Sequence, residues 1–146
     1  MNILFLDQYT QLGGAQQCLL DLLPAIQQQG WHAEVLAPRD GPLFDQARML
    51  EMPCRRLLSF PAAAATADLL YVNGPRLLPL AALVRRPVVF HAHSVVGPRW
   101  ARNIAAWALR AAAAEVIAVS EFAAAPLRSF VPDQRIRVVY NGVQDL

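Results

Sequence analysis

The first fifteen residues, MNILFLDQYTQLGGA (residues 1–15), set the pattern by which the rest of the chain can be interpreted. An apolar run ends at Asp7, a polar loop follows, and two glycines precede an amphipathic stretch that begins at Ala15. A short apolar run favours a buried strand, and apolar residues at helical spacing favour a helix packed against it. These residues therefore predict a strand, a loop and a helix, the beginning of a βαβ unit.

The same alternation continues to the end of the chain. Strands are predicted at 3–6, 33–37, 56–58, 69–72, 88–91, 116–119 and 136–139, and helices at 15–29, 43–50, 77–83, 99–113 and 121–130. Most apolar runs are uninterrupted, which indicates strands covered on both faces. We expect one α/β domain with a Rossmann-like, doubly wound parallel sheet of about seven strands and helices on both faces.

Local signals mark several element ends. Gly30 is placed to end the first helix, and Pro24 is expected to bend that helix. Ser120 resembles an N-cap, because its hydroxyl can accept a hydrogen bond from the free amides of the next turn. In the first helix the expected apolar face includes Cys18 and Leu19, and Gln16 is expected to point away from it.

Composition restricts the function classes only in part. The 13 basic residues are all arginine, and with 11 acidic residues they leave a net charge of +2. The chain before Gly74 carries −3 (4 Arg, 7 acids) and the chain from there on carries +5 (9 Arg, 4 acids), so the second half could attract an anion. A GC-rich coding bias explains the absence of lysine better than a role in binding nucleic acid does. The sequence contains no run of arginines interleaved with aromatic residues, so it does not favour nucleic acid as a partner.

Cysteine usage and the apolar tracts suggest a cytoplasmic protein. Cys18 and Cys54 are isolated within apolar segments, a pattern typical of buried, reduced thiols. The apolar run before Asp7 has no basic region and is too short for a signal peptide. The longest apolar tracts are interrupted by Asp68 and Arg110, so no segment is expected to span a membrane.

In an open parallel sheet, ligands bind beyond the carboxyl ends of the strands. Gly13 and Gly14 follow the first strand at a helix start, where free amides favour a phosphate or carboxylate. A tight turn without a ligand fits these glycines equally well. The loop is neither GxGxxG nor a P-loop.

Polar residues also follow later strands, notably Asn73 after the fourth and His93 after the fifth. His91 is still within the fifth run and is expected to be a hydrogen-bonded core residue, whereas His93 is the candidate for ligand contact. A zinc site would need a third ligand beside these two histidines, and no metal is expected. The arginine-bearing helix after them, with Trp100 and Trp107, is expected to bury its Trp face on the sheet more readily than to touch a membrane.

Five motifs in order resemble the N-terminal domain of GT-B fold glycosyltransferases, specifically family 4 of retaining enzymes. The glycine loop and the stretch from Gly30 to Pro38 are similar to the family's opening "GGA … GHEV…P" pattern. The stretches 68–73 and 87–93 are similar to its fourth and fifth strands. The stretches 115–122 and 136–143 resemble the segment that leads out of the domain.

The resemblance implies roles for individual residues. Gly13 and Gly14 would line the cleft beside the donor diphosphate, and His93 would approach the transferred sugar as the catalytic histidine. Asn73, Ser94 and Arg99 would face the acceptor. No cofactor is implied. The implied reaction moves a sugar from a nucleotide sugar to a polysaccharide or glycolipid acceptor, as in bacterial surface polysaccharide synthesis.

The resemblance also implies that residues 1–146 are the acceptor-side domain and that the donor-binding C-terminal domain is absent. We therefore expect the chain to be inactive alone and to expose a face that allows self-association. Peripheral contact with the inner face of the membrane would be made through the arginine-bearing helix that contains Trp100 and Trp107. The alternatives are a stand-alone Rossmann-like module that binds a ligand or partner without catalysis, and an epimerase of similar two-domain architecture.

Overall fold

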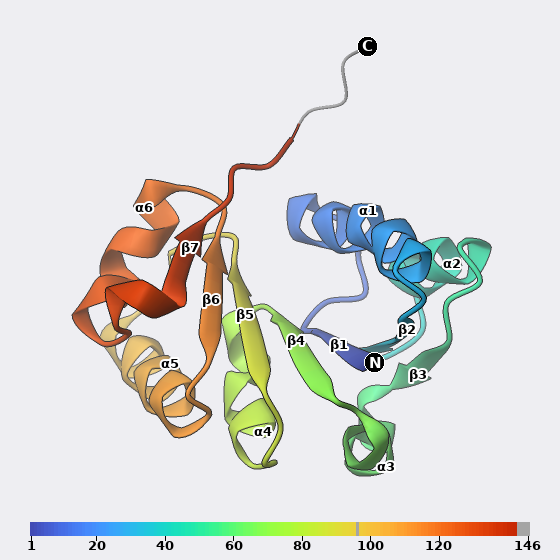
Figure 1. Ribbon diagram of the computed structural model, residues 1–146, viewed down its shortest axis with the longest axis horizontal. Coiled ribbons are helices and arrows are strands. Elements are labelled where there is room, and N and C mark those ends of the chain that lie inside the picture. The colour runs from blue at the N-terminus through green and yellow to red at the C-terminus, as the bar shows by residue number, and fades with distance from the viewer. Residues whose placement is uncertain (96, 143–146) are drawn as a thin grey trace.

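A computed structural model describes residues 1–95 and 97–142. Seven strands form one sheet in the order β3-β2-β1-β4-β5-β6-β7, and every neighbouring pair is parallel (Figure 1). The strands are β1 (Asn2–Asp7), β2 (His32–Ala37), β3 (Cys54–Arg56), β4 (Leu69–Asn73), β5 (Val88–Ala92), β6 (Glu115–Ala118) and β7 (Ile136–Val138). The predicted Rossmann-like fold is confirmed. Val143, the last residue of the final motif, lies outside the described residues.

Helices connect the strands throughout the described chain. The α-helices are α1 (Gly14–Gln28), α2 (Pro42–Met49), α3 (Phe60–Thr66), α4 (Leu78–Ala82), α5 (Arg99–Ala111) and α6 (Glu121–Ala124), and the short 3₁₀ helices are η1 (Leu57–Ser59), η2 (Pro75–Leu77), η3 (Ala125–Ser129) and η4 (Asp133–Arg135). In Figure 1, α1 and α2 lie on one side of the sheet, and α3, α4 and α5 lie on the other. The prediction of helices on both faces is confirmed.

Two cores result, because successive side chains of a strand point to opposite faces of the sheet. In β1, Phe5 packs with residues of α1 and α2, whereas Leu4 packs with residues of α3 to α6. The first core ends before β5 and β6, where Val89 and Ile117 are only half-buried. An open groove of about 770 Å³ lies there. The expectation that both faces of every strand are covered is therefore wrong for these two strands.

The third strand and the helix after it differ from the prediction. The strand predicted at 56–58 instead ends at Arg56, and η1 and α3 follow. Leu58 is 93% exposed, whereas Phe60, Ala63 and Ala64 face the core at helical spacing. The alanine-rich run of α3 offers small side chains that let the helix lie close to the sheet, a feature that apolar patterning did not reveal. Similarly, the helix predicted at 121–130 divides into α6 and η3 near Pro126.

Several local signals are confirmed. The Gly30 amide donates to the Gln27 carbonyl at 2.9 Å, and its φ of +72° is the left-handed conformation common just past a helix end. Ser120 Oγ accepts from the Ala123 amide at 3.1 Å, as an N-cap does. Within α1, however, the buried stripe is Gln16, Leu19, Leu20, Leu23 and Ile26, so the expectation that Gln16 points away from the core is wrong.

Candidate functional site

The order of the strands reverses between β1 and β4, the adjacent strands from which the chain proceeds to the two opposite edges of the sheet. Crevices at such a point, beyond the carboxyl ends of the strands, are the usual ligand sites of open α/β sheets. Asp7 is the last residue of β1 and Asn73 the last of β4, and the two are register partners. The polar ends of these strands therefore meet where the topology favours a ligand.

Asp7 anchors this edge. Its side chain is fully buried. Its Oδ1 accepts hydrogen bonds from the Tyr9 amide and from Gln16 Nε2, both at 2.9 Å, and its Oδ2 accepts from Asn73 Nδ2 at 2.6 Å. Burial raises the pKa of this carboxyl, while the three donors work in the opposite direction. Three donors and no acceptor match the ionised form, which can only accept.

Asn73 joins the carboxylate to the next strand end. Its Nδ2 donates to Asp7 and, at 3.1 Å, to the carbonyl of Ala15 in the first turn of α1. Two acceptors on one side of the amide determine its orientation, so Oδ1 faces the other way, toward His93. The side chain is 1% exposed. Asn73, for which the sequence suggested acceptor contact, thus lies beneath His93.

His93 completes the chain of hydrogen bonds. Its Nε2 lies 2.7 Å from Asn73 Oδ1, and an amide oxygen only accepts, so Nε2 carries the proton and Nδ1 is the acceptor of a neutral ring. Burial lowers the pKa of this histidine, which favours the neutral form. The ring is half-buried, and His93 directly follows the last residue of β5 at the carboxyl edge of the sheet. A single tautomer of His93 is therefore held by Asp7 through Asn73.

His91 is hydrogen-bonded, as expected, but it is half-buried and lines the open groove rather than lying in the core. Its Nδ1 lies 2.7 Å from the Tyr71 hydroxyl. Burial, with a smaller contribution from His93, lowers the pKa of His91 to about 4. The rings of His91 and His93 lie with their centroids 4.0 Å apart. His91 thus supports the flank of the His93 ring.

The glycine loop lies beside this chain of residues. Gly13 precedes α1 in an extended conformation, and a Cβ there would meet Gln16 Oε1 at 3.1 Å. Nothing lies within 4 Å of a Cβ added at Gly14, so the start of α1 faces open space. No acidic side chain occupies the first turn of α1. The free amides at this helix start can therefore receive an anionic group.

Two further contacts hold the loop in place. The Thr10 carbonyl accepts from the Leu43 amide at 3.0 Å. Gly74, with φ of +127°, lies against Gln8, whose Oε1 accepts from the Arg76 amide at 3.0 Å. The loop after β1 is thus tied both to α2 and to the loop after β4.

Other candidates lie around this centre. Ser94 is exposed just after His93, and Arg99 is exposed at the start of α5. Cys18 and Cys54 are free and half-buried, less enclosed than the sequence suggested. Among residues 1–95 and 97–142, no three metal-binding side chains gather in one place, and none of the helices has the length and apolarity needed to cross a bilayer.

Sequence reasoning missed Asp7 and Gln16 as site residues. The position of Asp7 at the carboxyl end of the first strand was a usable signal, because that edge is where ligands bind. For Gln16 the signal was its spacing of three, four and seven residues from Leu19, Leu20 and Leu23, which places all four on one helix face. A buried glutamine on such a face needs partners, and here Asp7 is one.

Comparisons with known proteins identify the family of this chain. The model of the family described as Glycosyltransferase Family 4 matches residues 12–145. A comparison with curated proteins found no match.

Among solved structures, HepE from Anabaena in complex with UDP is 25% identical, with 98% of this chain covering 44% of that one at a TM-score of 0.85. The complex of the same protein with UDP-glucose gives 27% identity, 98% and 44% coverage, and a TM-score of 0.78. The apo form of WaaB, a lipopolysaccharide outer core galactosyltransferase, shares the fold at 16% identity, 98% and 46% coverage, and a TM-score of 0.72. The chain spans less than half the length of these proteins. Because the family model covers most of its length, this chain belongs to glycosyltransferase family 4.

Proposed function

We propose that the chain is the acceptor-side, N-terminal domain of a retaining glycosyltransferase that moves a sugar from a nucleotide sugar to a polysaccharide or glycolipid acceptor. The observation that carries this proposal is the chain of hydrogen bonds from Asp7 through Asn73 to His93, with the open start of α1 beside it. The UDP and UDP-glucose complexes of HepE support a UDP-sugar donor.

Gly13 and Gly14 are the proposed contacts of the donor diphosphate. Backbone amides at a helix start, reinforced by the helix dipole, stabilise negative charge without a lysine or a metal. The diphosphate gains charge as its bond to the sugar breaks, so donors aimed there favour the transition state over the ground state. A side chain at Gly14 would fill the open space on which this contact depends.

His93 is the proposed contact of the transferred sugar. With Nε2 donating to Asn73, the ring offers Nδ1 as an acceptor for a sugar hydroxyl. Ser94 and Arg99, both exposed in the chain that follows His93, are proposed to face the acceptor. Asn73 is then a positioning residue, since it acts through His93.

In the proposed reaction the bond between the anomeric carbon and the diphosphate oxygen breaks. The acceptor hydroxyl oxygen forms the new bond on the same face of the sugar, and its proton leaves with the diphosphate. The carboxylate that is joined to His93 through Asn73, that of Asp7, is fully buried, so it is not placed to act as a nucleophile on the sugar. Catalysis would therefore rest on orientation and on electrostatic support of the leaving group.

A donor held only by this domain would lack the contacts that a second domain supplies, so we expect the chain alone to turn over poorly. The first test mixes the chain with UDP-glucose and measures release of UDP. Release near the background rate is expected, and robust turnover would refute the need for a second domain.

The second test reads the coding sequence downstream of Leu146 and assays the full-length product with nucleotide sugars and a lipid-linked acceptor. A continuing frame with two glutamates seven residues apart, and transfer by its product, would support the transferase. A stop codon directly after Leu146, together with tight ligand binding by the chain alone, would support the binding module instead.

A further inference from the structure

The exposed face of α5 differs from what the sequence suggested. The Trp-bearing face of this helix was expected to pack on the sheet, and that expectation is wrong. Trp100 is 68% exposed, Ile104 45% and Trp107 52%. The face that packs on the core instead consists of small and medium side chains, namely Ala105, Ala106, Ala108 and Leu109.

The three exposed side chains form one stripe. Positions i, i+4 and i+7 of a helix lie on the same face, so Trp100, Ile104 and Trp107 are neighbours along about 10 Å of the helix. Single exposed apolar residues are ordinary, but three large ones in a row mark an interaction surface. This stripe, Trp100–Ile104–Trp107, is called the Trp stripe below.

The charge around the Trp stripe has one sign. Between Asp68 and Glu115 the sequence contains no acidic residue and six arginines. Three of them, Arg99, Arg102 and Arg110, are exposed on α5, and no ion pair of theirs occurs in the described part of the chain. The arginines of the first half differ, since Arg48, Arg55 and Arg56 are paired with acids. Arg110 follows Trp107 by three residues and therefore lies beside the Trp stripe, where its charge is not compensated by an acid in the described part of the chain.

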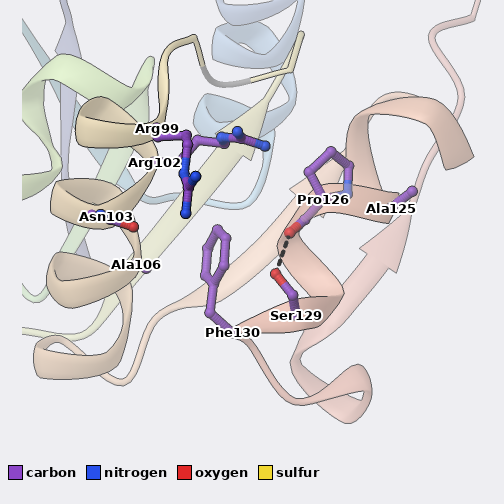
Figure 2. A pocket seen from close by; sticks show the side chains of 8 residues that line it. All are labelled: Arg99, Arg102, Asn103, Ala106, Ala125, Pro126, Ser129 and Phe130. Atoms are coloured by element: carbon purple, nitrogen blue, oxygen red, sulfur yellow. Dashed lines mark hydrogen bonds between the residues drawn. The ribbon is translucent and has the colours of Figure 1, made fainter.

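A shallow groove runs beside the basic flank of α5. Figure 2 shows Arg99 and Arg102 reaching from α5 over the side chain of Phe130, with Pro126 on the far wall. The groove has a volume of about 250 Å³. Its far wall is held by the hydrogen bond from Ser129 Oγ to the Pro126 carbonyl at 2.9 Å.

We propose that this face of α5 docks on the surface of an anionic phospholipid bilayer. Tryptophan prefers the boundary between headgroups and acyl chains, and unpaired arginines beside it attract anionic headgroups. A protein partner for the same face would need a matching acidic surface, whereas an anionic bilayer supplies that charge everywhere. The proposal goes beyond the proposed sugar transfer and does not depend on it.

The position of α5 gives the docking a consequence. The helix begins only a few residues after His93, so the Trp100 end of the stripe lies toward the carboxyl edge of the sheet. Docking through the Trp stripe would hold that edge near the lipid surface. An acceptor carried by a lipid could then reach it without leaving the membrane.

The test measures binding of the chain to vesicles of phosphatidylcholine with about one third phosphatidylglycerol, by co-sedimentation and by tryptophan fluorescence. The chain has three tryptophans, so in a Trp31→Phe background all emission comes from α5. We expect a blue shift with anionic vesicles and none with pure phosphatidylcholine. Binding should weaken as salt is raised.

Matched variants locate the surface. Trp100→Ala with Trp107→Ala should weaken binding about tenfold or more, and Arg110→Gln about fivefold. The controls Trp31→Ala and Arg39→Gln, which alter the same residue types away from α5, should bind like the unmodified chain. All these side chains are exposed, so circular dichroism should show unchanged folding.

Three outcomes would overturn the proposal. The first is equal binding to zwitterionic and anionic vesicles, and the second is equal binding by the double Trp variant and the unmodified chain. The third is a dimer of the chain that the double Trp variant converts to a monomer without any vesicle binding by either, which would make this face a protein interface.

Discussion

His93 donates a hydrogen bond from Nε2 to Asn73 Oδ1 across 2.7 Å, and Asn73 in turn donates to Asp7 across 2.6 Å. Three strand ends, those of β1, β4 and β5, are joined by these two bonds. Because Asn73 also donates to Ala15 in the first turn of α1, the segment that follows the glycine loop and His93 are connected through Asn73. The interpretation of the sequence required the glycine loop and the loop that carries His93 to lie at one edge of the sheet, and this arrangement is confirmed.

Replacing Asn73, the residue that connects Asp7 to His93, should destabilise the folded chain. Asn73→Ala removes donors from buried Asp7 and the acceptor of His93, and an unsatisfied buried carboxylate is costly. We expect the free energy of unfolding to fall by about 2–4 kcal/mol, measured by urea denaturation. Asn103→Ala on the exposed face of α5 is the matched control and should change it by no more than about 0.5 kcal/mol. A loss of similar size in both variants would contradict the role given to Asn73.

Gly74 is predicted to tolerate no side chain. Its φ of +127° strains any L residue, and a Cβ would lie 2.5 Å from the Gln8 side chain. Gly74→Ala should therefore cost about 1–3 kcal/mol in unfolding free energy. Adding Gln8→Ala removes the steric contact but not the backbone strain, so the double variant should recover only part of the loss. Full recovery would show that the backbone conformation costs nothing.

Gly14 should separate stability from function. Nothing lies within 4 Å of a Cβ at this helix position, so Gly14→Ala should leave the urea midpoint unchanged or slightly raised. In the full-length enzyme the same methyl group would enter the space proposed for the donor diphosphate, and we expect the KM for the nucleotide sugar to rise about tenfold. An unchanged KM would remove Gly14 from the donor contacts.

Stability should fall as the pH is lowered from neutrality. His91 has a pKa of about 4 in the folded chain against an ordinary value of 6.5, chiefly because of burial. Between these two values the unfolded chain binds a proton that the folded chain does not, so this contribution is complete above pH 6.5 and is lost toward pH 4. Because the ring is only half-buried, we expect about 1–2 kcal/mol from His91.

Urea denaturation at several pH values between 7.5 and 4.5 measures this slope. His93 acts in the same direction, whereas the raised pKa of Asp7 acts in the opposite one, since protonation of Asp7 favours the folded chain. His91→Gln should flatten the dependence. Equal stability at pH 7.5 and pH 5 in the unmodified chain would contradict the assigned burial.

His93→Ala in the full-length enzyme should lower kcat more than it raises the KM for the nucleotide sugar. The ring is proposed to orient the transferred sugar, and a lost orienting contact typically costs about 10- to 100-fold in turnover. His32→Gln, at the amino end of β2 and therefore at the opposite edge of the sheet, is the control. Equal activity in the His93 variant would remove this residue from the site.

The local sequence pattern was enough to predict most of the helices and strands. Uninterrupted apolar runs such as residues 3–6 indicated buried parallel strands, and the predicted caps at Gly30 and Ser120 were found. Where it failed, as at Leu58 and in α3, the apolar residues had no periodicity that separates strand from helix. An Ala-rich helix is recognisable only once the sheet against which it packs is known.

The amino-acid order alone was sufficient for the βαβ alternation, for the glycines at the start of α1 and for the polar residues at strand ends, because each is a property of a few neighbouring residues. Packing in three dimensions was needed to place β1 beside β4, bringing Asp7 to Asn73 over 66 residues, and to turn Gln16 inward. It also decided that the small side chains of α5 pack on the core while Trp100 and Trp107 remain outside. The physical reason is that burial depends on which surfaces meet, and partners distant in the sequence supply those surfaces.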